Sequence, residues 1–590
     1  MQDLSIEGFR LSPQQKHLWQ IQKADFGKPY CACCSILIEG DCQPEILRKA
    51  LQESVKRYEI LRTNFQALKE MTVPLQVIND EIAVPITNYE FEKLSPEAQN
   101  TKLQLLFHEK KQQAFAFEKG ILLDISWVTL SSDKHMLIVS LPALCADRVT
   151  FKNLMLEISR AYAGYLNNQA LADELPPLQY ADLAEWQNEL FEGEEAALGK
   201  EYWNKRKDII AFANNQFGFE NPKALNLGFK PESLSLSLAA DQVAKLEAIS
   251  HKYDASVSVL LQACWQILLW RLSGKSDVTL GAYCDGRNYE ELESVLGLFS
   301  KFLPVYCHLK DEFRFSEVLK KTDEVRNETF KWQESFSWEQ ITKLSRDTPE
   351  IRFFSSCFEF DERPIQHSVA GLSFSIDQQY VCFDRFKLKL SCVRSNNDLL
   401  AEFHYDSGLF QRAVIERLAE QFQRFLKSII ENPEAFIGQL EILSDRERQQ
   451  LLIEFNETQT DYPHCQSQCI HQLFETQVTS KPNQVAVVFE DQQLTYAELN
   501  TRANQLAHYL QQLGVGPEVL VGLYVERSLE LIVGLLGILK AGGAYLPLDP
   551  ALPKESVAFR LQDAQVSVLL SQQQLVETLP EGGTRLICLD

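Results

Sequence analysis

Hydrophobic residues recur along the chain with two periods, and together they predict an α/β protein. Positions 256–274 are apolar almost all round, which predicts a buried helix. Positions 386–393 alternate apolar residues with Lys387 and Lys389, which predicts a strand whose lysines face solvent. In positions 136–154 an apolar run meets a proline-containing turn and then a helical pattern. This order predicts a strand, a tight turn and a helix, a common place for reactive groups in enzymes.

Helix starts and polar stretches divide the chain into segments. Ser12 with Gln15, and Thr495 with Glu498, have the spacing of capping boxes and predict helix starts. A polar, proline-bearing stretch places a boundary near residue 175, and a turn-rich stretch follows residue 452. Beyond it, short apolar runs alternate with helical patterns, which favours a parallel sheet. The predicted segments are 1–175, 176–440, a linker at 441–465, and 466–590.

The charge balance and the cysteines exclude several classes of partner. The chain has 590 residues and a formal charge of −23, which disfavours nucleic acid, because phosphate binding needs a concentrated basic surface. Its longest apolar runs fall short of the roughly 20 residues of a membrane helix, and its first residues lack a signal-peptide pattern. We therefore expect a cytoplasmic protein without a membrane partner. The cysteine cluster at 31–34 lacks zinc-site spacing, so we expect reduced, buried thiols and no metal.

The turn "PALCADR" (142–148) is the first candidate site. Cys145 would be a nucleophile if its thiolate were stabilised, but no lysine or histidine is close in sequence, which favours an inert thiol. His135 has the strand parity of Ala143, yet eight extended residues place it about 26 Å away. The remaining candidates are interpreted as packing or surface residues: His17, His308, His404, Tyr180 and Trp186.

Several ordered motifs resemble those of a nonribosomal peptide synthetase module. The first group resembles condensation domains and covers about residues 8–440: "LSPQQKHLW" (11–19), "RYEILRTNF" (57–65), "YADLAEW" (180–186) and "GRNYEELESVLGLFSKFLP" (286–304). In the last of these, Lys301 stands where the family usually has asparagine. "LTYAEL" and "LKAGGAYLPLDP" (539–550) resemble the beginning of an adenylation domain.

The resemblance implies a specific fold. We expect two chloramphenicol-acetyltransferase-like lobes in a V-shaped pseudodimer, 1–175 and 176–440, followed by a partial α/β adenylate-forming subdomain. The family's ATP-binding motifs do not occur before Asp590. The adenylation domain is therefore expected to be incomplete in this chain, which should not activate an amino acid by itself.

The resemblance also gives the turn a meaning. Condensation domains carry HHxxxDG at this place, and its second histidine accepts a proton or orients the acceptor amine. Pro142 and Ala143 occupy the two histidine places, so no catalytic residue is intact. Asp147 is expected to form a structural ion pair with Arg287. Arg148 replaces the glycine, where it would either narrow the tunnel between the lobes or bind an acidic group.

Two functions remain open at this point. In the first, the domain is impaired in amide-bond formation and acts as a docking platform for carrier proteins, for the rest of its own adenylation domain, or for a tailoring enzyme. In the second, it is an atypical but active condensation domain that forms an amide or ester mainly by positioning two thioester-bound substrates. A free-standing acyltransferase is disfavoured by the adenylation segment. In both, the only cofactors are the 4′-phosphopantetheine arms of carrier partners, and the chain itself binds none.

Overall fold

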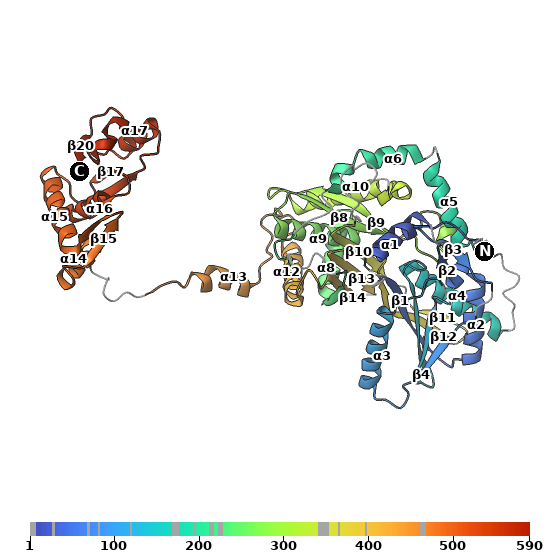
Figure 1. The fold of residues 1–590 in the computed structure, drawn as a ribbon. Coiled ribbons are helices and arrows are strands. Elements are labelled where there is room, and N and C mark those ends of the chain that lie inside the picture. Colours follow the sequence, from blue (N-terminus) through green and yellow to red (C-terminus); the bar gives the residue numbers. More distant parts are fainter. Residues whose placement is uncertain are drawn as a thin grey trace, which may run out of the picture. The chain divides into compact units, whose positions relative to one another are not determined.

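The computed structural model describes most of the chain in two compact units, residues 1–453 and 454–590. The described residues are 7–25, 30–67, 71–80, 83–118, 121–167, 176–193, 196–211, 217–221, 228–339, 353–363, 366–395, 398–460 and 468–590. The first unit contains two six-stranded sheets, one in each lobe (Figure 1). The predicted two-lobed α/β organisation is confirmed.

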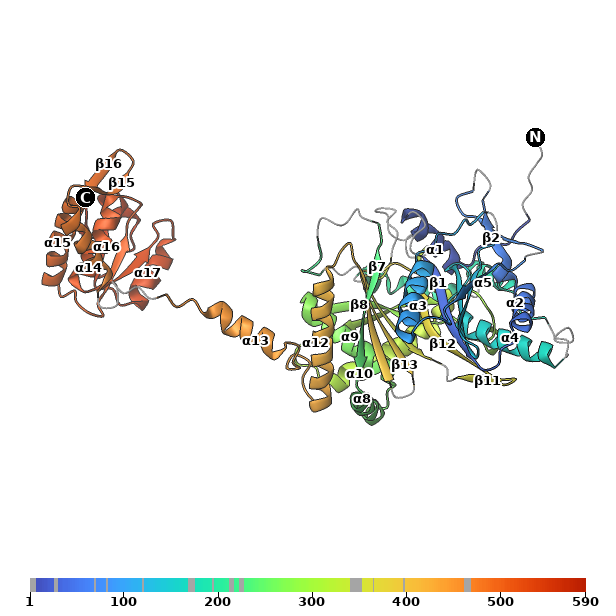
Figure 2. The same cartoon turned by 90° about the horizontal axis from the view of Figure 1, so that it is seen from below.

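The sheet of the first lobe is sandwiched between helices. Its strand order is β11 (His367–Val369), β12 (Leu372–Val381), β1 (Cys31–Glu39), β6 (Lys134–Pro142), β5 (Asp124–Ser131) and β4 (Ile86–Glu90). Helices α2 (Pro44–Arg57) and α4 (Arg148–Leu166) cover one face, and α3 (Pro96–Lys111) covers the other (Figure 2). The cysteines at 31–34 lie at the start of β1, where Cys31, Cys33 and Cys34 are buried.

Four helices cover one face of the sheet of the second lobe. Its strand order is β7 (Pro231–Leu238), β14 (Asp398–Asp406), β13 (Leu388–Ser395), β10 (Ser356–Glu362), β8 (Asp277–Cys284) and β9 (Lys301–His308). The covering helices are α8 (Ala240–Lys252), α9 (Val257–Ser273), α10 (Phe315–Lys331) and α12 (Arg412–Glu431). The predicted buried helix is α9: Ser256 caps its start, and Gly274 ends it in a left-handed conformation with φ 66°.

Shorter elements complete the first unit. They are α1 (Pro13–Ala24), the 3-10 turn η1 (Glu59–Arg62), β2 (Thr63–Gln66), β3 (Leu75–Ile78), α5 (Tyr180–Glu192), α6 (Ala197–Asn204), α7 (Lys207–Ala211), η5 (Glu290–Leu292) and η6 (Gln333–Ser335). The predicted capping box is present at α1, where Gln15 N donates to Ser12 Oγ and Ser12 N donates to Gln15 Oε1.

The second segment contributes two strands to the first sheet. Residues 367–381, which the sequence placed in the second segment, form β11 and β12 at the edge of the first sheet. β12 runs antiparallel to β1, with Ala32 opposite Val381. Its inward side chains Leu372 and Phe374 are buried in the first lobe's core, and this burial stabilises that arrangement.

The second unit is a small parallel α/β structure, as predicted. Its four-stranded parallel sheet has the order β18 (Ala544–Leu548), β17 (Leu520–Tyr524), β19 (Val568–Ser571) and β20 (Arg585–Cys588). The other elements are α14 (Ile470–Ser480), β15 (Val485–Phe489), β16 (Gln492–Thr495), α15 (Tyr496–Gln512), α16 (Leu529–Ala541), α17 (Lys554–Asp563) and η8 (Gln573–Thr578). α13 (Asp445–Leu452) and η7 (Glu454–Asn456) fall within the stretch predicted as a linker.

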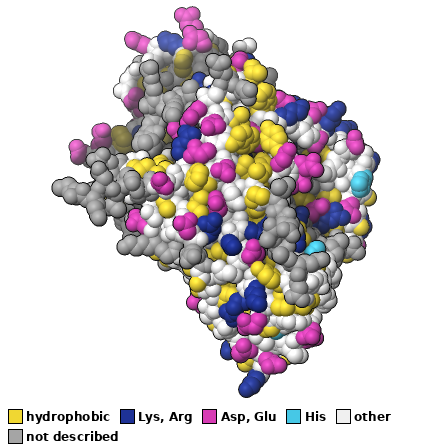
Figure 3. Space-filling model, turned by 90° about the vertical axis from the view of Figure 1, so that its right-hand side faces the viewer, with side chains coloured by type: hydrophobic (Ala, Val, Ile, Leu, Met, Phe, Trp, Pro, Cys, Tyr) yellow, Lys and Arg dark blue, Asp and Glu magenta, His cyan; other side chains and the backbone are white. Residues whose placement is uncertain are grey.

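Surface charge and helix length bear on the expected partners. Acidic and basic side chains are mixed over the described part of the face in Figure 3. Within the described ranges, no single helix is long and apolar enough to cross a membrane. The pair α8 and α9 passes that test only when taken together, and it is bent by 98°.

Candidate functional site

The turn "PALCADR" connects β6 to α4 at the boundary between the lobes. Asp147 is the N-cap of α4: its Oδ1 accepts hydrogen bonds from Thr150 N at 2.9 Å and from Thr150 Oγ1 at 2.8 Å. A side-chain oxygen at this position satisfies amide groups that the first helical turn leaves unpaired. The strand, turn and helix predicted from the sequence are therefore present, with the helix beginning at Arg148.

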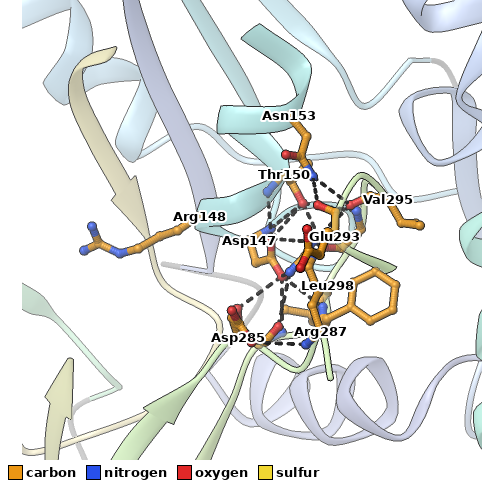
Figure 4. A network of polar contacts seen from close by, with 12 residues as sticks. Asp147, Arg148, Thr150, Asn153, Asp285, Arg287, Glu293, Val295 and Leu298 are labelled. Atoms are coloured by element: carbon orange, nitrogen blue, oxygen red, sulfur yellow. Dashed lines mark hydrogen bonds and ion pairs between the residues drawn. The ribbon is translucent and has the colours of Figure 1, made fainter. Parts of the chain in front are cut away.

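The Asp147 carboxylate joins this turn to the second lobe (Figure 4). Arg287 donates to it twice, from Nη1 to Oδ2 at 2.8 Å and from Nη2 to Oδ1 at 3.1 Å. The backbone amides of Phe299 and Ser300 and the Ser300 hydroxyl also donate to Oδ2, at 3.1, 3.2 and 3.1 Å. The ion pair expected between Asp147 and Arg287 is thus present, with side chains 0% and 2% exposed.

This set of donors decides the charge of Asp147. Burial by itself disfavours the ionised carboxyl, but the charge and hydrogen bonds of Arg287, together with those of Thr150, outweigh burial and hold the pKa below its usual value. The carboxylate is therefore ionised at neutral pH and fully engaged in holding the turn.

A glycine and a tyrosine bring the second lobe close to the turn. Gly297 has φ +146°, and a Cβ on it would lie 2.0 Å from Cδ2 of Tyr180, so a larger residue does not fit. The Tyr180 hydroxyl donates to Leu298 O at 2.5 Å and lies 2.9 Å from Ser12 Oγ at the start of α1. Tyr180 is thus buried between the lobes. Trp186 packs edge-on against Tyr289, with ring centroids 5.8 Å apart.

Pro142 and Ala143 stand where the resemblance expects two histidines, and both are buried. Ala143 is fully buried, and neither it nor Pro142 has a side chain that accepts a proton. Cys145 is also fully buried, and burial raises the pKa of its thiol, which keeps it protonated. His135 stacks on Trp127 with ring centroids 4.7 Å apart, towards the other end of β6.

Arg148 points away from the Asp147 cluster (Figure 4). Its Nε forms an ion pair with Glu359 of β10, and its Nη1 lies 3.4 Å from Asp361 Oδ2. Nη2 donates to Ser391 Oγ of β13 at 3.3 Å, and the backbone O of Arg148 accepts from Gln379 Nε2 of β12 at 2.7 Å. The acidic group that Arg148 binds is therefore the protein's own.

Glu359 connects Arg148 to a second cation. Its Oε2 lies 2.9 Å from Lys389 Nζ of β13, and the side chains of Arg148, Glu359 and Lys389 are only 5%, 1% and 4% exposed. We name these three residues the interlobe triad. Burial disfavours the charge of Glu359, but Arg148 and Lys389 outweigh burial and lower its pKa to about 2. The triad therefore links α4 of the first lobe to β10 and β13 of the second lobe beside the turn.

The triad corrects one prediction from the sequence. Lys387 and Lys389 were expected on a solvent face, and both are buried. The face of the second sheet opposite its helices lies against the first lobe, so its polar side chains need partners. Lys387 Nζ lies 3.0 Å from Glu220 Oε2, as Lys389 pairs with Glu359. The period of two was correct, but it does not distinguish solvent from a polar interface.

The described residues line several cavities in the first unit. Near β7 and β14, Lys111, Tyr380 and His404 line a cavity of about 620 Å³. His17 lines a hollow of about 500 Å³ that α1, α5 and α6 also border, and a recess of about 40 Å³ beside Ser300 and the start of β9. Of the interlobe triad, Glu359 lies on β10 and Lys389 on β13, the central strands of the second sheet, and Arg148 lies at the start of α4. Among the described residues, no cluster of histidine, cysteine and carboxylate side chains is arranged to hold a metal.

Sequence comparison supports the motif evidence. Residues 7–452 match the family model of the condensation domain, and residues 474–589 match that of AMP-binding enzymes. The chain is 31% identical over 579 residues to bacitracin synthase 3 from Bacillus licheniformis, covering 97% of the chain and 9% of that protein. It is 30% identical over 591 residues to gramicidin S synthase 2 from Brevibacillus brevis, covering 97% and 13%. The chain thus spans a small part of the curated relatives it matches.

Solved structures show the same fold. The peptide synthetase FmoA3 superposes with a TM-score of 0.75 at 20% identity, covering 99% of the chain and 60% of FmoA3. The four-domain synthetase holo-AB3403, bound to AMP and glycine, superposes with a TM-score of 0.71 at 18% identity. The match covers 100% of the chain and 45% of holo-AB3403. An X-domain from teicoplanin biosynthesis, in complex with OxyB, superposes with a TM-score of 0.61 at 21% identity. The match covers 75% of the chain and 97% of that chain. These likenesses establish the fold.

The Asp147 cluster gives a stability prediction. Asp147→Ala is expected to lower the free energy of unfolding of the first unit by about 3–5 kcal/mol, because it leaves Arg287 buried without its partner. All eight tryptophans lie between residues 19 and 338, so tryptophan fluorescence during urea unfolding reports on this unit alone. The matched control is Asp285→Ala, an exposed carboxylate that accepts from Arg287 N, with an expected loss below about 0.5 kcal/mol. Equal losses in the two variants would contradict the stabilising role assigned to the Asp147 cluster.

The interlobe triad gives a pH prediction. The pKa of Glu359 is about 2 in the folded protein against an ordinary value of 4.5. The stability it contributes is therefore fully present above pH 4.5 and is lost as the pH falls towards 2. In Glu359→Gln, urea unfolding followed by tryptophan fluorescence should show a weaker loss of stability over that window. Glu416→Gln, which changes an exposed carboxylate on α12, should keep the wild-type slope. An unchanged slope in Glu359→Gln contradicts the assignment.

Proposed function

This chain belongs to the nonribosomal peptide synthetase family, with a condensation domain followed by a region of the AMP-binding type, and we propose that the condensation domain acts as a docking platform. In this proposal the domain is impaired in amide-bond formation at its turn. Its partners are peptidyl and aminoacyl carrier proteins and the rest of its own adenylation domain. The cofactors it meets are the 4′-phosphopantetheine arms of those carriers.

One observation carries this proposal: the turn keeps its structural contacts while the groups for chemistry are absent. Asp147 and Arg287 hold the turn in place. Ala143 supplies no proton acceptor, and a well-placed acceptor or orienting group is worth about 10² to 10⁴ in rate. Arg148 and Glu359 then occupy the space between the lobes, where two substrates would have to meet.

A tailoring enzyme is a further candidate partner. The X-domain that shares this fold is described in complex with OxyB, which shows that such a two-lobed domain can serve as a binding surface. The likeness is at the level of fold, so the partner of the present domain has to be found by binding experiments with its own pathway enzymes.

Atypical but active condensation is the second candidate, and the cavities favour it. One is lined by α1, α5 and α6 and the other by residues of β7 and β14, so each would admit one arm. Positioning alone supplies about 7–11 kcal/mol of a reaction barrier, so a missing histidine does not by itself abolish amide or ester formation. The interlobe triad opposes this candidate, because its charged side chains are buried between the lobes, where the two substrates would meet.

The experiment restores the two missing features separately and together. Donor and acceptor carrier proteins are loaded, and the amide product is followed by mass spectrometry. Wild type, Ala143→His and Arg148→Gly should each give product near the protein-free background, because each still has at least one defect. The double variant should exceed them by at least about 100-fold, since it has both a proton acceptor and an open path.

The matched control is Ala143→Gln combined with Arg148→Gly, which opens the path without adding an imidazole and should stay near background. Carrier binding should differ by less than threefold among all variants. Wild-type product formation as fast as that of the double variant would contradict the platform proposal and support the second candidate.

A further inference from the structure

Histidine–carboxylate pairs are the arrangement most often used to take up a proton, and the described chain contains three of them. They are His17 with Asp384 at 3.2 Å, His308 with Asp277 at 3.0 Å, and His404 with Glu402 at 3.6 Å. Their surroundings differ in exposure and in the charges that lie nearby.

His308 and His404 are unsuited to catalysis. His308 lies at the end of edge strand β9 with its side chain 42% exposed, so its pair with Asp277 is on the surface. His404 is buried, and burial together with the nearby Lys389 lowers its pKa, which makes it a weak proton acceptor.

His17 is held on two sides. Its Nε2 lies 3.2 Å from Asp384 Oδ1, and its ring stacks on Trp338 with centroids 5.8 Å apart and planes at 24°. Asp384 is buried and also accepts a hydrogen bond from Arg385 N at 2.8 Å. An imidazole that donates one N–H to a carboxylate keeps its other ring nitrogen as an acceptor. The pair therefore has the arrangement of a general base and its positioning residue.

His17 also lies where a wide hollow meets a narrow recess. The hollow of about 500 Å³ and the recess of about 40 Å³ share Pro13, His17, Ser337 and Trp338 in their linings. A recess of this size holds a water molecule, which needs roughly 10–15 Å³ and two to four polar partners. Ser300, Lys301 and Asp384 supply polar groups around it. The Lys301 ammonium donates to Gln333 O at 3.0 Å and adds a buried positive charge.

Ser300 lines the recess and donates to Asp147, so the recess lies beside the Asp147 cluster. An acyl group that enters from the hollow would therefore meet His17 and water at this place.

We propose that this cavity hydrolyses the thioester of a carrier-bound acyl group, with His17 as the catalytic residue and Asp384 as its positioning residue. His17 accepts a proton from water while the water oxygen attacks the thioester carbonyl carbon. A C–O bond forms, the C–S bond breaks, and the imidazolium returns the proton to the leaving thiolate. The products are a carboxylic acid and the free thiol of the arm. This activity goes beyond the platform role and does not require the turn.

The test offers the full chain an acyl thioester without any amine. S-acetyl-pantetheine and an acetylated carrier protein are the probes, and the released acetate is measured, because the exposed Cys469 of the chain would itself react with a thiol reagent. Wild type should release acetate faster than the protein-free control. His17→Gln should lower kcat by about 100-fold or more, the range for loss of a general base. Asp384→Asn should lower kcat while KM changes by less than twofold, because Asp384 orients the base without touching the substrate.

The matched control is His308→Gln, which removes the other closely spaced histidine–aspartate pair and should keep the wild-type rate within twofold. Because His17 stacks on Trp338, an unchanged midpoint of urea unfolding followed by far-ultraviolet circular dichroism shows that His17→Gln is folded. The proposal is overturned if wild type does not exceed the protein-free rate, or if folded His17→Gln keeps the wild-type kcat. Both results are independent of the amide assay, since no amine is present, so this inference and the platform proposal fail separately.

Discussion

The two-lobed arrangement depends on the buried carboxylate of Asp147. A single side chain caps α4, pairs with Arg287 and accepts hydrogen bonds from the Phe299 and Ser300 amides, so it fixes one lobe's helix against the start of a strand in the other lobe. Such a group is costly to bury alone and is retained only when all its partners are present. This explains how the turn keeps its shape although its histidine places hold proline and alanine.

Once the turn is held in this way, the adjoining position can change without loss of the fold. Arg148 starts α4 and extends to Glu359, which Lys389 also neutralises. Each member of this triad would be destabilising without the others, because an unpaired buried charge costs several kcal/mol. A glycine at position 148 would leave Glu359 with a single cation. The arginine therefore belongs to an interface in which the polar face of the second sheet is charge-paired.

The sequence predicted what depends on local pattern. The buried helix α9, the capping boxes at Ser12 and Thr495, and the turn before α4 follow from periodicity and capping chemistry. It did not predict contacts between distant residues: Arg148 meets Asp361 213 positions away, and His17 meets Asp384 367 positions away. A periodic lysine pattern marks one face of a strand, but whether water or another lobe covers that face depends on tertiary packing. The Asp147–Arg287 contact was accessible only through the family resemblance.

The interlobe triad also bears on the chemistry proposed for the cavities. Its three charged side chains are buried between the lobes, and the two larger cavities are lined by separate sets of residues. The oriented imidazole of His17 lies beside a recess with room for water, which favours water as the nucleophile in the proposed reaction. Hydrolysis needs one carrier-bound substrate and water, so it is compatible with the buried charges that join the lobes, whereas condensation has to bring two substrates past them.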